Sequence, residues 1–460
     1  MNLEFYIGPP GASAPRAASA APAAVETPHG GIDTGRIDRL IADIDARVGS
    51  VVDAILHHPE FQALEASWRG LHFVVERVAF EQNVEIEIWD CTKQELQDDF
   101  SDAPDITRLH FFRNVYVAEY GQFGGRPYAA IFANFTISHE PPDVALLRSM
   151  AAVSAMAHAP TFVAAAPKLL RLTSFAELPL MSNPQAVFDD PAYTRWNAFR
   201  ETEDSRYVGV LLPRMLLRLP YRDATGSAES FVYDETVDDE RGTLWGSPIF
   251  AFAVRLADSF ARFRTSTGLL GTTDDEAPVL DSHPALGDEY VKPPVEVLLS
   301  RRLEQGLSGL GIIPLTCDPV RATLRFATAS SLQMPKTFGT HEGGEAATLN
   351  HLLGTRLPHL LLVSRFAHYL KVLERERIGG HRTRDEVERE LNEWLAQYVN
   401  QMPNPSMATR LRFPLRAARV RTGDVNGAPG WYRMDVLIQP HLRYMGQSFT
   451  LSVTGRIDTR

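Results

Sequence analysis

The chain has 460 residues, a formal net charge of -11 and a sequence pI of about 5.7. This length can bury a core without covalent staples, and the acidic balance argues against nucleic acid or an anionic membrane surface as the main partner. The only cysteines, Cys91 and Cys317, are isolated in the sequence, which excludes a disulfide framework or a thiolate metal cage and fits a reducing cytoplasm.

The first 31 residues are predicted to form a flexible arm that carries one short strand. Residues 9–31 are rich in Ala, Pro, Ser and Gly, which is the composition of a linker, and we expect no secretory signal at the start. Ahead of the linker, Leu3, Phe5 and Ile7 alternate with other residues at the period of a strand. This strand has no local sheet to join, so it is either a frayed terminus or an addition to a sheet in another subunit.

Two amphipathic helices are predicted next, separated by a proline. Apolar residues recur at helical spacing over residues 37–55, with Asp33 or Thr34 available as N-cap. Pro59 ends this helix and suits the first turn of the following one. The apolar face of the second helix carries Phe61, Leu64, Trp68, Leu71, Val75 and Val78. We expect a helical hairpin with a shared apolar seam.

Strand and helix patterns then alternate, which predicts an α/β layer architecture. The predicted strands are 84–89, 129–133, 161–166, 207–212, 295–299 and 312–315. The predicted helices are 106–120, 143–158 and 249–264. The most apolar stretch, 144–170, is interrupted by charged residues and prolines, which favours a buried helix followed by a strand over a membrane span. Residues 271–292 are acidic and contain two prolines, as is typical of a surface loop.

The C-terminal part predicts a separate domain made of a helical pair and an antiparallel meander. The helices are expected at 351–376 and 384–399, and the strands at 417–421, 431–439 and 449–453. We therefore predict an α/β (α+β) protein with layered mixed sheets, flanking helices, an N-terminal helical hairpin and a C-terminal meander. The expected divisions are an arm at 1–31, a hairpin plus α/β domain at 32–300 and a C-terminal α/β domain at 301–460.

Four clusters have residue types that catalysis or ligand binding needs, and each is better explained by structure. His57 and His58 diverge as neighbours and lack further metal ligands at suitable spacing. The glycine-rich turn at 121–127 follows a helix and precedes a strand, the reverse of a phosphate-binding loop. Glu201, Glu203 and Asp204 lie beside arginines and are expected to form ion pairs. Ser364 and His368 are four residues apart on one helix, where a nucleophile lacks an elbow and an oxyanion hole. We expect no catalytic residues, no cofactor and no metal.

Several stretches, in the same order along the chain, resemble the large subunit of the bacterial type VI secretion contractile sheath, the TssC/VipB family. They are HHPEFQALEASWRGL at 57–71, GQFGGRPY at 121–128, PDVALL at 142–147, AHAP at 157–160, FRETEDSRYVG at 199–209, LPR at 212–214, LPY at 219–221, LSGLGIIPL at 307–315, SRFAHYLK at 364–371, LNEW at 391–394 and FPLRAAR at 413–419. Together they span the chain from about residue 36 to its end.

This resemblance implies a cytoplasmic structural protein that forms a heterodimer with a small sheath subunit. The dimers polymerise, through copies of the same chain, around an inner tube on a baseplate, and contraction drives the tube outward. A disassembly ATPase then recycles the sheath, although the prolines in 9–31 leave its usual recognition helix in question. Two other classes remain open from the sequence: an α/β enzyme with a site assembled from distant residues, and a scaffold that does not contract.

Two surface hypotheses follow from the resemblance. Strand pairing between subunits is expected to involve the two chain ends, at Leu3, Phe5, Ile7, Val436, Ile438, Leu451 and Val453. Contact with the inner tube is expected on the charged helix at 384–399, at Glu386, Arg389, Glu390 and Glu393. The competing explanation for this helix is a solvated charged face.

Overall fold

The computed structural model describes residues 33–102, 105–122, 124–221, 231, 233–237, 242–270, 280–281, 294–318, 323–339, 342–376, 384–424, 431–441 and 451–458. The chain divides into two compact units. The first unit is Met1–Ile55 with Tyr221–Glu235, and the second unit is Leu56–Pro220 with Thr236–Arg460.

The first unit is built on one long amphipathic helix, α1 (Thr34–Leu56). Asp33 caps it as predicted, since its Oδ1 accepts a hydrogen bond from the backbone N–H of Arg36 at 3.1 Å. The Tyr233 hydroxyl donates to Asp53 Oδ1 at 2.6 Å, which ties the later segment of this unit to the helix. The apolar stripe of α1 is not buried as a hairpin seam would require. Its exposed members, 42–60% accessible, are Ile37, Leu40, Ile41, Ile44, Val48, Val51 and Ile55.

The second unit contains the remaining described helices. In chain order these are α2 (Pro59–Arg77), α3 (Lys93–Asp102), α4 (His110–Phe112), α5 (Ala118–Tyr120), α6 (Pro141–Ala157), α7 (Gln185–Phe188), α8 (Thr194–Arg200), α9 (Ile249–Phe263), α10 (Arg301–Gly309), α11 (Glu342–Gly354), α12 (Leu357–Glu376), α13 (Arg384–Ala396) and α14 (Met407–Arg412). A π-helical turn at Arg113–Val117 joins α4 to α5, so the helix predicted over 106–120 is present from His110 onward, while Ile106–Arg108 form a separate 3-10 turn.

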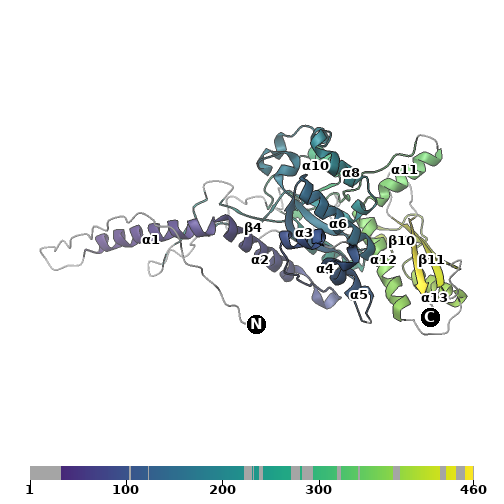
Figure 1. The fold of residues 1–460 in the computed structure, drawn as a ribbon. Helices are drawn as coiled ribbons and strands as arrows, with labels where there is room; N and C mark the ends of the chain where they lie inside the picture. The colour runs from purple at the N-terminus through teal and green to yellow at the C-terminus, as the bar shows by residue number, and fades with distance from the viewer. Residues whose placement is uncertain are drawn as a thin grey trace. The chain divides into compact units, whose positions relative to one another are not determined.

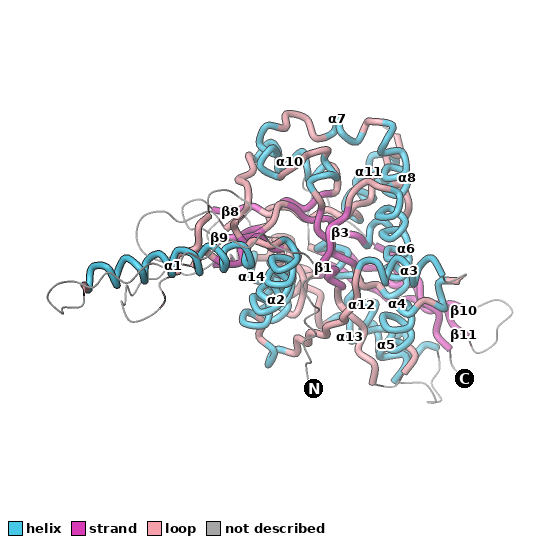
Figure 2. Tube along the Cα trace, turned by 60° about the vertical axis from the view of Figure 1, so that its left-hand side comes forward, coloured by secondary structure: helices cyan, strands magenta, loops and turns pink. Residues whose placement is uncertain are grey.

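A four-stranded parallel sheet forms the centre of the second unit (Figures 1 and 2). Its order is β1 (Ile131–Ile137), β2 (Thr161–Ala165), β3 (Val208–Leu212) and β7 (Ile312–Pro314). The other strands of the α/β part form two small antiparallel groups. These are β4 (Met215–Arg218) with β5 (Leu244–Gly246), and β9 (Thr323–Arg325) between β6 (Leu280–Asp281) and β8 (Thr316–Asp318).

Alternate residues of the parallel strands face two different hydrophobic cores. Phe162, Leu211 and Ile313 pack in a core with residues of α2 and α9. Their neighbours Val163, Val210 and Ile312 pack in a core with residues of α6, α8 and α10. The near-continuous apolar runs of β2 and β3 follow from this burial on both faces. The prediction of a layered α/β architecture is confirmed.

The C-terminal part has its own core beneath an antiparallel sheet. The sheet order is β10 (Leu415–Asp424), β11 (Trp431–Pro440) and β12 (Leu451–Asp458). Leu362 and Phe366 of α12 and Leu391 of α13 pack together with Val436 and Ile438 of β11, among other residues, on this sheet. Figure 1 shows β10 and β11 side by side with α13 next to them. The predicted helical pair and meander are confirmed.

Three local predictions are wrong. Residues 84–89 form no strand, and their glutamates instead bond through side chains, Glu85 to Arg126 and Glu87 to Tyr128. Only Val295 of the strand predicted at 295–299 pairs, in an isolated bridge to Met215.

The helix expected at 351–376 is broken into α11 and α12. Ser331 N–H donates to Thr355 C=O at 2.7 Å and Leu357 N–H to Ala329 C=O at 3.1 Å, so residues 355–357 pair with another segment. Pro358 lacks a backbone N–H and fits the first turn of α12. Within the predicted loop at 271–292, only Leu280–Asp281 lies in the described part of the chain.

Candidate assembly surfaces

Helix α2 packs against the rest of the second unit through a face other than the apolar face predicted from the sequence. Gly70, Phe73 and Val74 are its buried residues. A Cβ atom at Gly70 would lie 2.2 Å from the Phe250 ring, so only glycine allows α9 to approach this closely. At the same helix, the Glu65 carboxylate accepts from Arg218 Nε of β4 at 2.8 Å in a largely buried ion pair, and from Arg69 Nε at 2.7 Å.

The apolar face predicted for α2 is instead mostly exposed. Leu64, Trp68 and Val75 are 57%, 64% and 44% accessible, and Phe61 is 38% accessible. Together with the half-buried Leu71 these residues recur at spacings of three, four, three and four, the period of a seam that receives another helix. The helix therefore has two apolar faces, of which the described part of the chain covers one.

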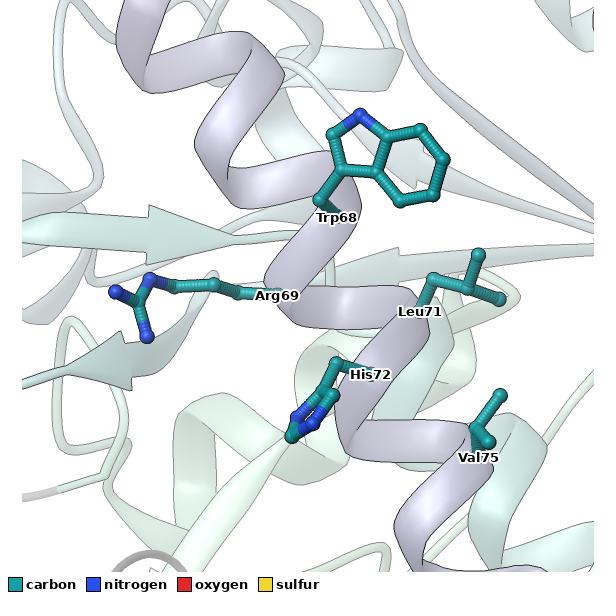
Figure 3. Close-up of a pocket in the computed structure, with 5 residues that line it drawn as sticks. All are labelled: Trp68, Arg69, Leu71, His72 and Val75. Carbon is teal, nitrogen blue, oxygen red and sulfur yellow. The ribbon is translucent and has the colours of Figure 1, made fainter. Parts of the chain in front are cut away.

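An open depression of about 490 Å³ lies along this exposed face. Trp68, Arg69, Leu71, His72 and Val75 line it, and Figure 3 shows Trp68, Leu71 and Val75 projecting from one side of the helix while Arg69 projects from the other. Its lining combines Trp68 and Arg69, residue types that are enriched among the hot spots of protein interfaces, with His72 and the apolar side chains of Leu71 and Val75. This composition fits a protein partner better than a polar small molecule.

The C-terminal sheet locates the residues expected to pair between subunits. Val436 and Ile438 lie in the central strand β11, where Val436 is paired with Val453 and Ile438 with Leu451 of β12. Both residues of β11 are buried. Among the described strands β12 pairs only with β11. It is therefore an edge strand of this sheet, and a strand from another subunit that adds at this edge would pair with β12. Leu3, Phe5 and Ile7 lie outside the described residues.

Helix α13 divides its residues between a packed side and an exposed side. Leu391 and Leu395 are buried against the C-terminal sheet. Glu386, Arg389 and Glu393 are exposed, and Glu390 is half-buried. The four residues proposed for tube contact thus lie largely on the outer side of this helix.

The serine and histidine considered for nucleophilic chemistry are core residues. Ser364 and His368 are 2% and 1% accessible. His368 Nε2 lies 2.9 Å from Ala157 C=O, and His158 Nδ1 lies 3.2 Å from the Tyr207 hydroxyl. Burial lowers the pKa of His368 to about 3 and that of His158 to about 4, with Arg365 and Lys371, respectively, adding to the effect. The neutral imidazole of His368 connects α12 to the end of α6, and that of His158 connects the same end to Tyr207, just before β3.

The other clusters also hold elements in place. Glu203 bonds to Arg206 and, at 2.7 Å, to Lys336 Nζ, as expected for an ion-paired loop. Arg200 is buried and donates to Leu332 C=O at 3.2 Å. His58 occupies the N-cap position of α2, where it is exposed and makes no side-chain cap bond.

The glycine-rich turn is a helix end, as predicted. A Cβ atom at Gly125 would lie 2.4 Å from Glu119 C=O, and Arg375 donates to the carbonyls of Glu119 and Gly125 at 2.9 and 2.8 Å. Within the described residues, no group of three His, Cys, Asp or Glu side chains is arranged to hold a metal ion. None of the helices in the described ranges combines the length and the apolar composition that spanning a bilayer requires.

The sequence is similar to a protein family and to a characterised protein that are both described as sheath components. The family described as EvpB/VC_A0108, tail sheath N-terminal domain, matches residues 38–333, and the corresponding gpW/gp25-like domain matches residues 346–457. The type VI secretion system sheath protein TssC1 of Pseudomonas aeruginosa is 35% identical over 433 residues, covering 92% of this chain and 86% of that protein. A chain in the cryo-EM structure of the anti-feeding prophage baseplate aligns over 82% of this chain and 80% of its own length, with a TM-score of 0.35 and 11% identity.

Proposed function

This chain belongs to the family of tail-sheath large subunits of type VI secretion systems, and on that premise we propose how it meets its partners. It is a structural subunit of the contractile sheath. We propose that it pairs in the cytoplasm with a small sheath subunit, that the heterodimers polymerise around an inner tube on a baseplate, and that no residue is catalytic. A disassembly ATPase acts on the spent sheath in this scheme.

The exposed face of α2 is the observation that carries this proposal. A helix that buries Gly70, Phe73 and Val74 yet exposes Leu64, Trp68 and Val75 has apolar surface for a second protein. The spacing of the exposed residues suits a helix, so we assign this face to a helix of the small subunit.

Co-purification with a tagged small subunit tests this assignment. Trp68→Glu and Leu64→Glu place a charge in the proposed seam and should reduce recovery of the complex at least tenfold. Glu76→Lys, on the same helix with 54% of the glutamate side chain accessible, is the matched control and should leave recovery unchanged. Equal recovery of Trp68→Glu and the control would remove α2 from the interface.

Strand exchange at β12 is the second part of the proposal. Backbone pairing gives affinity with little sequence demand, and alternating side chains set the register. The strand predicted at Leu3–Ile7 of one subunit would add to the C-terminal sheet of a neighbour or to its small partner. Deleting residues 1–8 should preserve the heterodimer, because the described cores remain, and should abolish long sheaths. Full-length contractile tubes from the truncated chain would show that this strand is only a frayed end.

The outer side of α13 is the third contact, with the inner tube. Glu386 and Glu393 are exposed there, and charge reversal changes a contact without disturbing the buried Leu391 and Leu395. Glu386→Lys with Glu390→Lys should lower the fraction of tube-filled sheaths seen by electron microscopy while the heterodimer stays intact. Unchanged filling would mean that the charged face is merely solvated.

A further inference from the structure

An antiparallel sheet of three strands presents two edges, and each edge strand exposes backbone N–H and C=O groups that can pair with a foreign strand. In the C-terminal sheet these edges belong to β10 and β12. Strand exchange yields one defined lattice only if one of the two edges is selected. The contacts along β10 show how that selection is made.

Asn392 of α13 occupies the β10 edge at Val420. Its Oδ1 accepts from Val420 N–H at 2.9 Å, and its Nδ2 donates to Val420 C=O at 3.0 Å. The same nitrogen donates to Glu388 C=O of its own helix at 2.7 Å, which fixes the orientation of the amide. A side-chain amide offers one acceptor and two donors, so it can replace the peptide group of a neighbouring strand.

The edge is covered at two more points. Glu388 Oε2 accepts from both the N–H and the hydroxyl of Thr422 at 2.8 Å. At the start of the strand, Leu415 N–H donates to Tyr398 C=O at 3.2 Å and Leu415 C=O accepts from Asn400 N–H at 2.8 Å. Backbone groups of Leu415, Val420 and Thr422 are therefore engaged within the chain.

We propose that Asn392 and Glu388 close the β10 edge against foreign strands and thereby direct strand addition to β12. These two residues determine which edge of the C-terminal sheet accepts a foreign strand, and not how tightly β12 binds that strand. The inference rests on the strand exchange proposed above, because edge selection matters only if strands are exchanged. A simpler role, in which the two side chains only tether α13 to the sheet, makes a different prediction about association.

The test uses the heterodimer without inner tube protein and compares the double variant Asn392→Ala, Glu388→Ala with Gln397→Ala. Alanine favours the helix and removes the groups that cover β10, while Gln397 is exposed just after the end of α13 and serves as the control. Association is followed by light scattering over a concentration series, and amide hydrogen exchange is followed over residues 415–424.

The double variant should self-associate at a concentration at least tenfold lower than the wild type or the control. The amides of Val420 and Thr422 should exchange faster in its dilute form and become protected again in the associated form. The single change Asn392→Asp keeps an acceptor for Val420 N–H but loses the donor to its C=O, so it should give an intermediate shift and serves if the double variant fails to fold.

Association no stronger than that of the control, with Val420 and Thr422 left unprotected, would show that the side chains are tethers and overturn the proposal. This outcome is distinct from failure of the proposed function. In that case wild-type heterodimers would form no tubes when sheath assembly is assayed separately, whatever the variants do.

Discussion

At the scale of single residues, buried charged and polar groups join elements that are distant in sequence. Glu65 and Arg218 are separated by 153 positions yet form an ion pair whose side chains are 11% and 7% accessible. Removing one partner of such a pair leaves an unpaired charge in a dry site. The sequence gives no sign of this pairing, because neither residue belongs to a spacing that predicts a contact.

Arg218→Met should therefore destabilise the protein by about 2–3 kcal/mol, since Arg69 compensates the Glu65 carboxylate only in part. The double change Glu65→Leu, Arg218→Met should recover more than half of that loss, because it removes both charges. Chemical denaturation of the purified heterodimer measures both values. A larger loss in the double variant than in the single one would show that the pair itself is net stabilising.

The buried imidazole of His158 predicts a dependence of stability on pH. Its pKa is lowered to about 4 by burial, with a further contribution from Lys371, so the unfolded chain takes up this proton more readily than the folded one. The stabilisation is complete above the unfolded pKa of about 6.5 and falls by about 3 kcal/mol as the pH drops toward 4. Thermal unfolding between pH 7.5 and 4.5 should show this decline.

His158→Asn is the control for that pH dependence. His158 has a φ of 51°, and asparagine is among the residues that tolerate this conformation. The variant should lose part of the slope of stability against pH. An unchanged slope would assign the pH dependence to other groups, of which His368 is the first candidate.

At the scale of elements, helix α2 shows that an apolar periodicity predicts a helix but not which of its faces is buried in the chain's own core. Its periodic apolar residues predict a helix correctly, but the sequence assigns the wrong face to the chain's own core. The signal that was missed is Gly70, because a glycine inside a helix often marks a close approach by another element. Packing by Phe73 and Val74 then leaves Trp68 and Leu64 for a partner.

Gly70→Ala should destabilise the protein by about 1–3 kcal/mol, since the added methyl group would overlap the Phe250 ring and outweigh the better helix propensity of alanine. Trp68→Ser, two residues earlier on the exposed face, should change stability by less than about 0.5 kcal/mol. Both are measured by denaturation of the isolated large subunit or, if it is insoluble alone, of the heterodimer. Equal effects would contradict the assignment of the two faces.

Whether the other strands are predicted correctly depends on how their residues are buried and bonded in the fold. The parallel strands β2 and β3 are predicted well because burial on both faces makes them continuously apolar. Residues 84–89 have the alternation of a strand but form side-chain bonds to Arg126 and Tyr128 in place of a ladder. Asn392 could not have been identified from the sequence, because its role depends on a strand that begins 23 positions later.

At the scale of the whole molecule, exposed apolar surface and an open sheet edge belong to a subunit that functions in an assembly. The stripe of α1 and the outer face of α2 are apolar and accessible, and β12 has a free side among the described strands. Such surfaces favour aggregation when the partner is missing. The family membership could be predicted from collinear stretches of sequence, whereas the surfaces that carry assembly needed the fold.

Expression without the small subunit should accordingly yield aggregated or degraded protein, and co-expression should restore the soluble fraction several-fold. The soluble fraction after centrifugation is the measurement. Trp68→Glu should improve solubility of the chain expressed alone by reducing the exposed apolar surface, while reducing rescue by the partner. A wild-type chain that stays monomeric and soluble at high concentration would count against the assembly account.

Electron microscopy of the chain co-expressed with its small sheath subunit tests directly whether the chain builds a sheath. If the chain is a sheath large subunit, the purified material should contain long hollow helical tubes, and these should be lost when Trp68→Glu or the deletion of residues 1–8 is introduced. Uniform, discrete particles from the wild-type pair, with no tubes under conditions in which both proteins are soluble, would contradict the account.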